Sequence, residues 1–191
     1  RLLTSVFLRV EATVDRRDVT ADGSGDGLVV QAGPTGGVAQ GFTGNEHLRI
    51  DDPATTRIGD VSFDFWFKPD QPTVTWQPIV YKGSGTGVNG REYTLWLNAS
   101  GFLHLTSSDE SGQIDANTPG GAIVWDEWTH VTAVVDRTAK QLRLYLNGVL
   151  SASRALRDAP SVTVTEPLYL ARSLEDGIGF QGAMAGFRLY G

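Results

Sequence analysis

Hydrophobic and polar residues alternate along most of the chain with a period of two residues. This period is typical of β-strands, in which successive side chains point to opposite faces of a sheet. The alternation predicts strands over 61–68, 93–97, 101–106, 131–136 and 141–146. Shorter segments with the same pattern predict further strands at 161–165, 168–171 and 187–190.

The joints between these segments are rich in turn-forming residues. Asn147 and Gly148 separate the segment 141–146 from a return strand that opens at Val149, and this pair strongly favours a hairpin. Helical periodicity is nearly absent, although 151–158 has room for one turn before Pro160 ends it. Many short strands joined by turns that draw on 23 glycines and 8 prolines indicate an all-β sandwich or jelly roll.

Two polar segments, 82–90 and 107–121, are expected to be loops. Long loops in a compact domain often carry function. A surface loop of this length is also tolerated at little cost in free energy. The sequence favours neither interpretation.

The composition fits one folded domain with a sizeable core, since 40% of the 191 residues are hydrophobic. The net charge of −6 and the lack of a basic stripe argue against nucleic acid as a partner. No apolar run reaches the roughly 20 residues of a membrane-spanning helix, so membrane insertion is not expected. The absence of cysteine excludes disulfides and thiolate metal sites.

The first residues form a separate question. The chain begins with Arg1 and shows no signal-peptide pattern, so we expect it to be part of a longer protein. Dense charges separate Phe7, Val10 and Val14. We therefore expect an N-terminal arm or edge strand over 1–21 and the sandwich domain over 22–191.

Several motifs in a fixed order resemble the laminin-G-like members of the concanavalin A-like lectin/glucanase jelly-roll family. They are FTGNEHLRI at 42–50, VSFDFWFKP at 61–69, WTHVTAVVD at 128–136, LRLYLNG at 142–148, PLYLA at 167–171 and FQGAM at 180–184. The resemblance implies a concanavalin A-like sandwich of two antiparallel sheets.

The stretch DGSGDG at 22–27 has the oxygen spacing of the first half of an EF-hand calcium loop. The twelfth position is Gly33 rather than glutamate, and no helical pattern flanks the loop, so an EF-hand is excluded. In the family that the chain resembles, a polar turn stands here, and it often binds Ca²⁺ together with a distant aspartate. Ala185 occupies the place of that aspartate. Asp22 and Asp26 are therefore weak candidates for metal ligands, and a plain turn is favoured.

The sequence offers no catalytic constellation. Sandwich glucanases place their carboxylates on one strand as E-x-D-x-x-E or E-x-D-x-E, and neither pattern occurs. The histidines, His47, His104 and His130, are scattered, and no G-x-S-x-G is present. Asp109 and Glu110 are expected to be solvated charges in a polar loop. We therefore expect a protein without enzymatic activity.

Alternation also predicts which side chains face away from the core. If Phe63, Phe65 and Phe67 are buried, together with the leucines at 95, 97, 103, 105, 142, 144 and 146, then Asp64 points outward. The same parity, with these strands in one sheet, predicts a binding face made of Trp66, Thr94, Trp96, His104, Arg143 and Tyr145. Aromatic rings that stack on sugar rings and polar groups that bind hydroxyls suit a carbohydrate. The alternative is that these aromatic side chains pack under loops as a second small core.

Three further tryptophans lie near predicted turns. Trp76 is a candidate anchor at an exposed loop tip, whereas Trp125 and Trp128 are expected to be buried. The function that we expect is an extracellular or surface-displayed recognition module that binds carbohydrate or a protein partner. The alternative is a structural or assembly domain of a larger surface, virion or filament protein.

Overall fold

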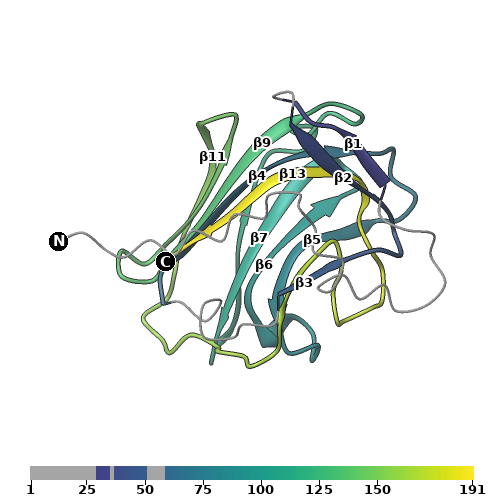
Figure 1. The fold of residues 1–191 in the computed structure, drawn as a ribbon. Coiled ribbons are helices and arrows are strands. Elements are labelled where there is room, and N and C mark those ends of the chain that lie inside the picture. Colours follow the sequence, from purple (N-terminus) through teal and green to yellow (C-terminus); the bar gives the residue numbers. More distant parts are fainter. Residues whose placement is uncertain (1–28, 35–36, 51–58) are drawn as a thin grey trace.

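In the computed structural model, the segments in which hydrophobic and polar residues alternate form two antiparallel β-sheets that face each other (Figure 1). The structure describes residues 29–34, 37–50 and 59–191. The residues Asp22 and Asp26, the turn around them and the expected arm at 1–21 lie outside this part. Within it, no helix has the length and apolarity that crossing a membrane requires. The expected all-β sandwich of two antiparallel sheets is confirmed.

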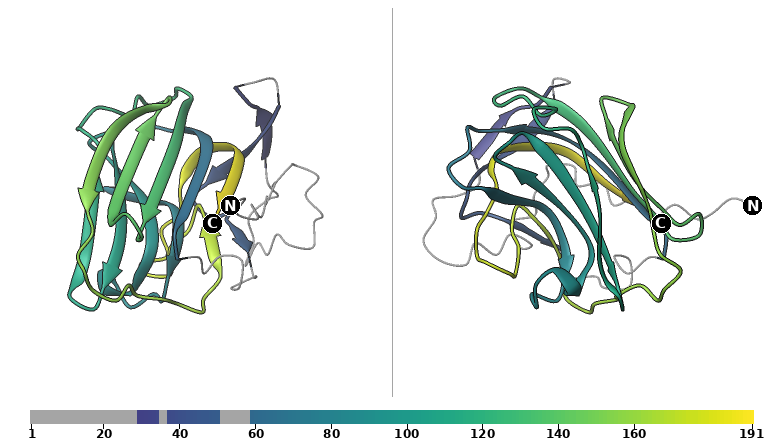
Figure 2. Two further views of the ribbon diagram at one scale, coloured as in Figure 1. Left: turned by 90° about the vertical axis from the view of Figure 1, so that its left-hand side faces the viewer. Right: turned by 180° about the vertical axis from the view of Figure 1, so that it is seen from behind.

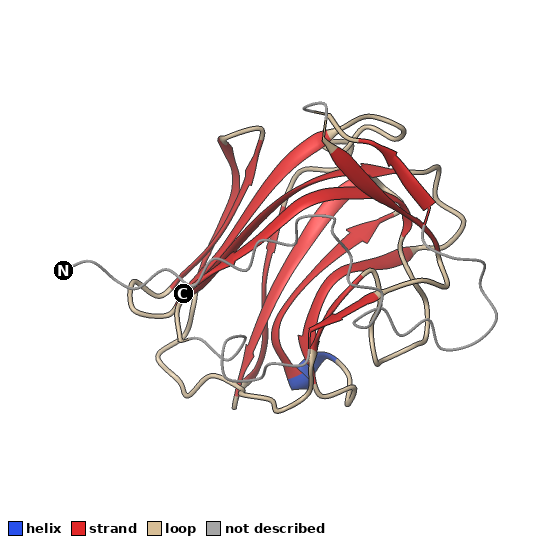
Figure 3. Cartoon of the chain, in the orientation of Figure 1, coloured by secondary structure: helices blue, strands red, loops and turns tan. Residues whose placement is uncertain are grey.

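One sheet has seven strands and the other has six (Figure 3). In spatial order the seven-stranded sheet contains β1 (Val29–Ala32), β2 (Val38–Thr43), β13 (Gln181–Tyr190), β4 (Val61–Pro69), β9 (Thr129–Asp136), β10 (Gln141–Leu146) and β11 (Val149–Ala155). The six-stranded sheet contains β3 (Leu48–Ile50), β12 (Leu168–Leu170), β5 (Trp76–Gly83), β6 (Arg91–Asn98), β7 (Phe102–Asp109) and β8 (Gly112–Asn117). A short 3₁₀ turn, η1 (Val88–Gly90), precedes β6.

The core lies between the two sheets. Phe63, Phe65 and Phe67 of β4 are fully buried, and the leucines of β6 and β7 meet them from the other sheet. Full burial of each such side chain stabilises the fold by about 1.5–3 kcal/mol. The predicted alternation of core positions along these strands is therefore confirmed.

The hairpin predicted at Asn147 and Gly148 joins β10 to β11. Both residues have positive φ, 49° and 81°, as a tight hairpin turn requires. Strand β11 forms the edge of the seven-stranded sheet, and the hairpin lies at the margin of the sandwich (Figure 2). The segment 151–158, which had room for one helical turn, forms none, because residues 149–155 pair with β10 instead.

The expected polar loop at 107–121 is also wrong. Strand β7 continues to Asp109, and a tight turn leads directly into β8. Strand β8 holds only two apolar residues, Ile114 and Ala116, and both face the core, while its polar residues alternate with them. Asp109 is not a solvated charge, since its side chain is 5% exposed and accepts two bonds from Arg157.

The strand expected at 161–165 does not form. Ser161 makes one isolated bridge to Asp109, and the following residues are held individually. The Val162 amide donates to the Ser108 carbonyl, and the Val164 amide donates to the Glu92 carboxylate. This segment therefore runs along the end of the six-stranded sheet instead of extending it.

Candidate functional site

The predicted binding face is divided between the two sheets. Thr94 and Trp96 lie on β6 and His104 lies on β7, in the six-stranded sheet. Trp66 lies on β4, and Arg143 and Tyr145 lie on β10, in the seven-stranded sheet. The premise that these strands share one sheet is wrong. Alternation within a strand predicts which side of that strand a side chain faces, but it does not predict which strands share a sheet.

The pairing of the six-stranded sheet brings a second set of side chains to His104. Pro78, Trp96, His104 and Asn117 stand side by side on four neighbouring strands. Trp76 lies two residues before Pro78 on β5, on the same face, and pairs with Asn98 of β6. The register thus collects residues from positions 76–117 on the outer face of one sheet.

Trp76 lies against two other rings of this face. Its ring centroid is 5.5 Å from that of Phe102 in a perpendicular arrangement and 5.3 Å from that of His104. All three side chains keep partial exposure. The sequence placed Trp76 at an isolated loop tip, whereas it opens β5 and belongs to an aromatic cluster.

His104 is held by polar neighbours on β8. Its Nδ1 lies 2.6 Å from Oδ1 of Asn117, and its Nε2 lies 3.4 Å from Oδ1 of Asp115. An amide oxygen only accepts, so Nδ1 carries a proton in this arrangement. The Thr106 hydroxyl and the Gln113 amide also donate to Asp115, which fixes the carboxylate next to the imidazole.

We refer to Trp76, Phe102, His104, Asp115 and Asn117 as the Trp76 patch. The indole N–H of Trp76 and the amide N–H₂ of Asn117 have no partner among the described residues. Asp115 adds an acceptor whose side chain is 28% exposed. The patch therefore combines partly exposed aromatic side chains with donors that lack a partner among the described residues and with an acceptor, which is the chemistry that recognises a sugar ring and its hydroxyls.

Trp96 is not part of the accessible surface, because it is 3% exposed. The Arg91 guanidinium lies 4.8 Å from the centre of its ring, and Arg91 is held there by two bonds to Glu175. The Trp96 indole N–H donates to the hydroxyl of Thr94, which is fully buried. These two predicted residues form a buried region of the same outer face, beside the patch.

Tyr81 completes this buried layer. Its ring meets Trp96 edge-on at 6.2 Å, and its hydroxyl accepts from the Gly85 amide. Burial and the nearby charge of Glu175 raise the pKa of the Tyr81 phenol well above its usual range. The phenol stays neutral at physiological pH and keeps its bonding role in the layer.

The remaining predicted residues lie on the outer face of the seven-stranded sheet. The Trp66 ring is 5.1 Å from that of His130, and His130 Nε2 is 3.4 Å from Asp64. Arg188 donates twice to the same oxygen of Asp64. These contacts place Trp66 next to His130 and the Asp64–Arg188 ion pair, on a different sheet from the Trp76 patch.

The other two residues of this sheet join no cluster with Trp66. Arg143 pairs with Asp136 at 3.3 Å, and Tyr145 is partly exposed opposite Thr132 of β9. Trp125 and Trp128, which were expected to be buried, also keep partial exposure. Trp125 packs against the core, and Lys68 Nζ lies 5.8 Å from the ring centre of Trp128.

The described residues hold no cluster of three or more histidine, aspartate or glutamate side chains that could bind a metal ion. Ala185 pairs with Trp66 in the sheet, and its methyl group offers no ligand oxygen. The weak candidates Asp22 and Asp26 lie outside the described residues, so the calcium question stays a prediction.

The fold and the face together define a jelly-roll sandwich protein with an aromatic and polar surface on one sheet. The chain belongs to the concanavalin A-like lectin/glucanases superfamily, because the sequence model of the Laminin_G_3 family matches residues 42–191. No curated protein sequence matches the chain.

Several solved structures are similar to the chain in fold. The binding domain of Paraclostridial Mosquitocidal Protein 1 is 16% identical with a TM-score of 0.68, over 86% of this chain and 42% of that one. Domain 4 of AbnA, a GH43 extracellular arabinanase from Geobacillus stearothermophilus in complex with arabinotriose, is 23% identical with a TM-score of 0.64. The match covers 89% of this chain and 78% of that one. The CBM40 of Ruminococcus gnavus IT-sialidase bound to α2,3 sialyllactose is 18% identical with a TM-score of 0.65, over 80% and 88%. The chain thus spans less than half of the first of these structures.

Part of the Trp76 patch could be predicted from the sequence. His104 was predicted from its parity, but Asp115 and Asn117 were missed because their segment was interpreted as a loop. The alternation of Gln113, Asp115 and Asn117 with Ile114 and Ala116 is the signal that identifies β8. The contact of Trp76 with His104 depends on sheet register, which no local pattern encodes.

Proposed function

We propose that this protein is a non-catalytic recognition module that binds a carbohydrate on the Trp76 patch. The observation that carries the proposal is the partly exposed Trp76 ring beside His104, together with the donors of Trp76 and Asn117 that have no partner among the described residues. A pyranose or furanose ring stacks on the indole while its hydroxyls bond to Asn117 and Asp115. The buried layer of Trp96, Thr94 and Arg91 keeps this surface rigid.

The comparisons support a binding role in a general way. Two of the similar structures contain an oligosaccharide, arabinotriose in one and sialyllactose in the other. They are neighbours in fold at low identity, so the sugar bound by this chain follows from its own patch. We also propose that the module works outside the cell or on a cell or virion surface.

The absence of catalysis is part of the proposal. Hydrolysis of a glycosidic bond with retention or inversion uses a pair of carboxyl groups on either side of that bond. The Trp76 patch contains one carboxylate, Asp115, which accepts from Thr106 and Gln113 and has no second carboxylate beside it in the patch. Incubation of the protein with its glycan ligand should release no new reducing ends, and release at a rate that depends on Asp115 would contradict the proposal.

The first experiment identifies the ligand and tests the polar side of the patch. A glycan array with the labelled protein selects a ligand, and isothermal titration measures its affinity. We predict that Asn117→Ala weakens binding by about tenfold, the loss expected for one well-placed hydrogen bond to a ligand group. The control is Asn147→Asp in the β10–β11 turn, away from the patch, which should leave the affinity unchanged. Equal affinity of Asn117→Ala and the natural protein for the glycan would exclude the Trp76 patch as the binding site.

One observation favours the alternative of a structural or assembly domain. Val149 and Leu150, at the start of edge strand β11, are 70% and 52% exposed. Exposed aliphatic residues on an unpaired strand edge are a common site of protein contact. Sedimentation velocity of the protein and of a Val149→Ser, Leu150→Ser double variant tests this alternative. Self-association that the double variant abolishes would favour it over carbohydrate binding.

A further inference from the structure

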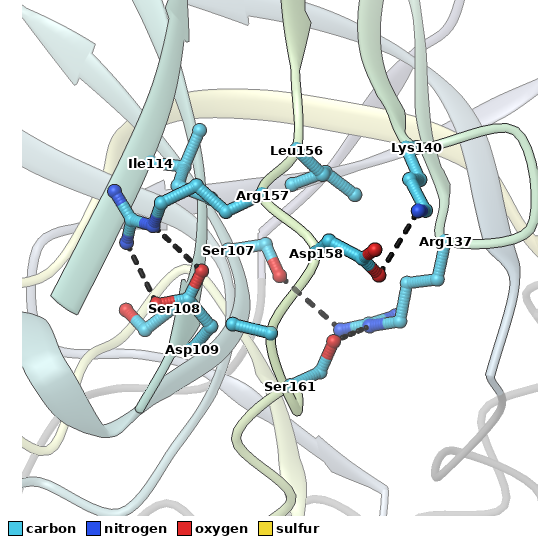
Figure 4. A pocket seen from close by; sticks show the side chains of 11 residues that line it. Ser107, Ser108, Asp109, Ile114, Arg137, Lys140, Leu156, Arg157, Asp158 and Ser161 are labelled. Carbon is cyan, nitrogen blue, oxygen red and sulfur yellow. Dashed lines mark hydrogen bonds and ion pairs between the residues drawn. The ribbon is translucent and has the colours of Figure 1, made fainter. Parts of the chain in front are cut away.

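A small polar cavity shares no lining residue with the Trp76 patch and lies at the end of the sheets where β7, β8, the β9–β10 turn and the segment 156–161 meet. Its volume is about 80 Å³. Three cationic side chains, two carboxylates and three serine hydroxyls line it, together with Ile114, Leu156 and Ala159 (Figure 4). A cavity of this size holds roughly five water molecules, so it admits a small ion or substituent and not a whole sugar ring.

Arg137 supplies a partly buried charge whose guanidinium forms no ion pair with the described residues, although its backbone amide donates to Oδ1 of Asp60 at 2.6 Å. Its guanidinium donates to the carbonyls of Gly59 and Glu92 and to the hydroxyls of Ser107 and Ser161. None of these four acceptors carries a charge. A buried cation normally contacts an anion, because removing it from water is costly otherwise. Burial lowers the pKa of the Arg137 guanidinium, and the more distant charges of Glu92 and Asp60 oppose that shift only in part.

The other two cations are paired differently. Arg157 binds Asp109 through two bonds, which leaves that pair neutral. In the described part of the chain, the one ion pair of Lys140 is with Asp158, at 2.9 Å, and the two side chains are 50% and 89% exposed. The lining therefore has three positive and two negative charges, and these two ion pairs leave Arg137, next to Lys140, as the lining cation without an ion pair among the described residues (Figure 4).

Several hydrogen-bond donors around Arg137 and Lys140 have no partner among residues 29–34, 37–50 and 59–191. The guanidinium of Arg137 has five donors and uses four, which leaves one on Nη1. The ammonium of Lys140 has three donors and uses one. The Ser161 hydroxyl accepts from Arg137 and keeps its own proton. An anion in the cavity can receive all of these bonds while it neutralises Arg137.

We propose that this cavity binds a tetrahedral oxyanion of the sulfate or phosphate class. Lys140, Arg137 and Ser161 donate to its oxygens, and Asp158 competes with it for Lys140. Because Asp158 is almost fully exposed, its side chain can turn into solvent when the anion binds. This site is independent of the Trp76 patch, and each can exist without the other.

The test is a titration of sodium sulfate, followed by ¹H–¹⁵N NMR of the arginine Nε–H groups and the backbone amides. The buffer contains no phosphate, and sodium chloride holds the ionic strength constant. We expect saturable shifts at Arg137 Nε–H and at the amides of Lys140 and Ser161. Shifts that grow linearly without saturation, or that occur equally at all basic residues, would overturn the proposal.

Two variants with opposite expected effects sharpen the test. Lys140→Met should weaken sulfate binding by about tenfold, since it removes a charge-assisted donor. Asp158→Asn should strengthen it several-fold, because it removes the competing carboxylate. The matched controls are Arg154→Met and Glu127→Gln, exposed residues outside the cavity that change the net charge equally. If each control behaves like its partner variant, only the overall charge matters and the site does not exist.

Further arms of the titration identify the source of the anion. Inorganic phosphate, a monosaccharide sulfate and its unsulfated parent sugar are compared with sulfate. Tighter binding of the monosaccharide sulfate than of sulfate assigns the cavity to a substituent carried on a sugar, and equal binding assigns it to the free ion. Binding of the unsulfated sugar at the same NMR positions would contradict an oxyanion site.

Discussion

At the scale of single residues, partners distant in the sequence decide whether a polar side chain is exposed or buried. Asp109 was expected to be solvated, yet Arg157, 48 positions later, holds it with two bonds of 2.8 and 2.7 Å. Trp96 was expected to face a ligand, yet Arg91 covers its ring and is held there by Glu175. Strand parity gave the direction of each side chain correctly. It carried no information on the loops that meet that side chain.

The Asp109–Arg157 pair predicts how stability depends on pH. The hydrogen bonds from Arg157 hold the pKa of Asp109 below its usual value of 3.8. A carboxyl group with a lowered folded pKa stabilises the fold above its unfolded pKa, and that contribution is lost as the pH falls through the folded value. We predict that Asp109→Asn lowers the free energy of unfolding at pH 7 and that its difference from the natural protein shrinks between pH 5 and pH 2.

Urea unfolding at pH 7, 5, 3 and 2 checks this prediction. Asp158→Asn is the control, because that side chain is 89% exposed and should show a much smaller difference at pH 7. A difference for Asp109→Asn that stays constant over the whole range would mean that the charge of Asp109 does not contribute.

At the scale of elements, alternation was a good guide wherever a strand buries large apolar side chains on one face. The segments 61–68, 93–97, 131–136 and 141–146 all lie within strands. The pattern failed for β8, whose two buried residues are outnumbered by polar ones, and for 161–165, where Pro160 and Pro167 flank a segment that finds no partner strand. A strand needs a neighbour, and the neighbour is determined by the whole fold.

The β10–β11 hairpin provides a prediction at this scale. Gly148 has a φ of 81°, a conformation that a side chain disfavours by about 1–2 kcal/mol. Gly148→Ala should therefore lower the free energy of unfolding by about that amount, although no atom lies within 4 Å of the added methyl group. The measurement is the urea midpoint at constant slope.

Gly59→Ala is the control for the hairpin variant. Its added methyl group also meets no atom within 4 Å, but its φ is not positive. We expect the stability of Gly59→Ala to be unchanged or slightly higher, because alanine restricts the unfolded chain. Equal losses in the two variants would show that the conformation of the turn is not the cause.

At the scale of the whole molecule, the assignment of strands to sheets determines the functional surface. The six residues predicted as one face lie three on each sheet, and the Trp76 patch replaces that face. The family resemblance predicted the sandwich over most of the chain. It did not determine which sheet of this chain carries accessible aromatic side chains, since that depends on loops such as the one that holds Glu175.

Metal dependence is a second question at this scale. With Ala185 in place of the expected aspartate, we predict that the unfolding midpoint is the same in excess calcium and in EDTA. A ligand that binds only the folded state adds about 2.7 kcal/mol at a hundredfold excess over its dissociation constant, so a site would be easy to detect. A calcium-dependent increase, abolished by Asp22→Asn or Asp26→Asn, would establish that the turn at 22–27 binds the ion.

The measurement that tests the central claim most directly compares two tryptophans, one on each sheet. The glycan selected on the array is titrated into Trp76→Ala and into Trp66→Ala, and circular dichroism verifies that both variants are folded. We predict that Trp76→Ala loses about tenfold or more in affinity, as expected for an aromatic anchor at the centre of a site, while Trp66→Ala binds like the natural protein. Unchanged binding by Trp76→Ala together with lost binding by Trp66→Ala would contradict the account and place the ligand on the seven-stranded sheet.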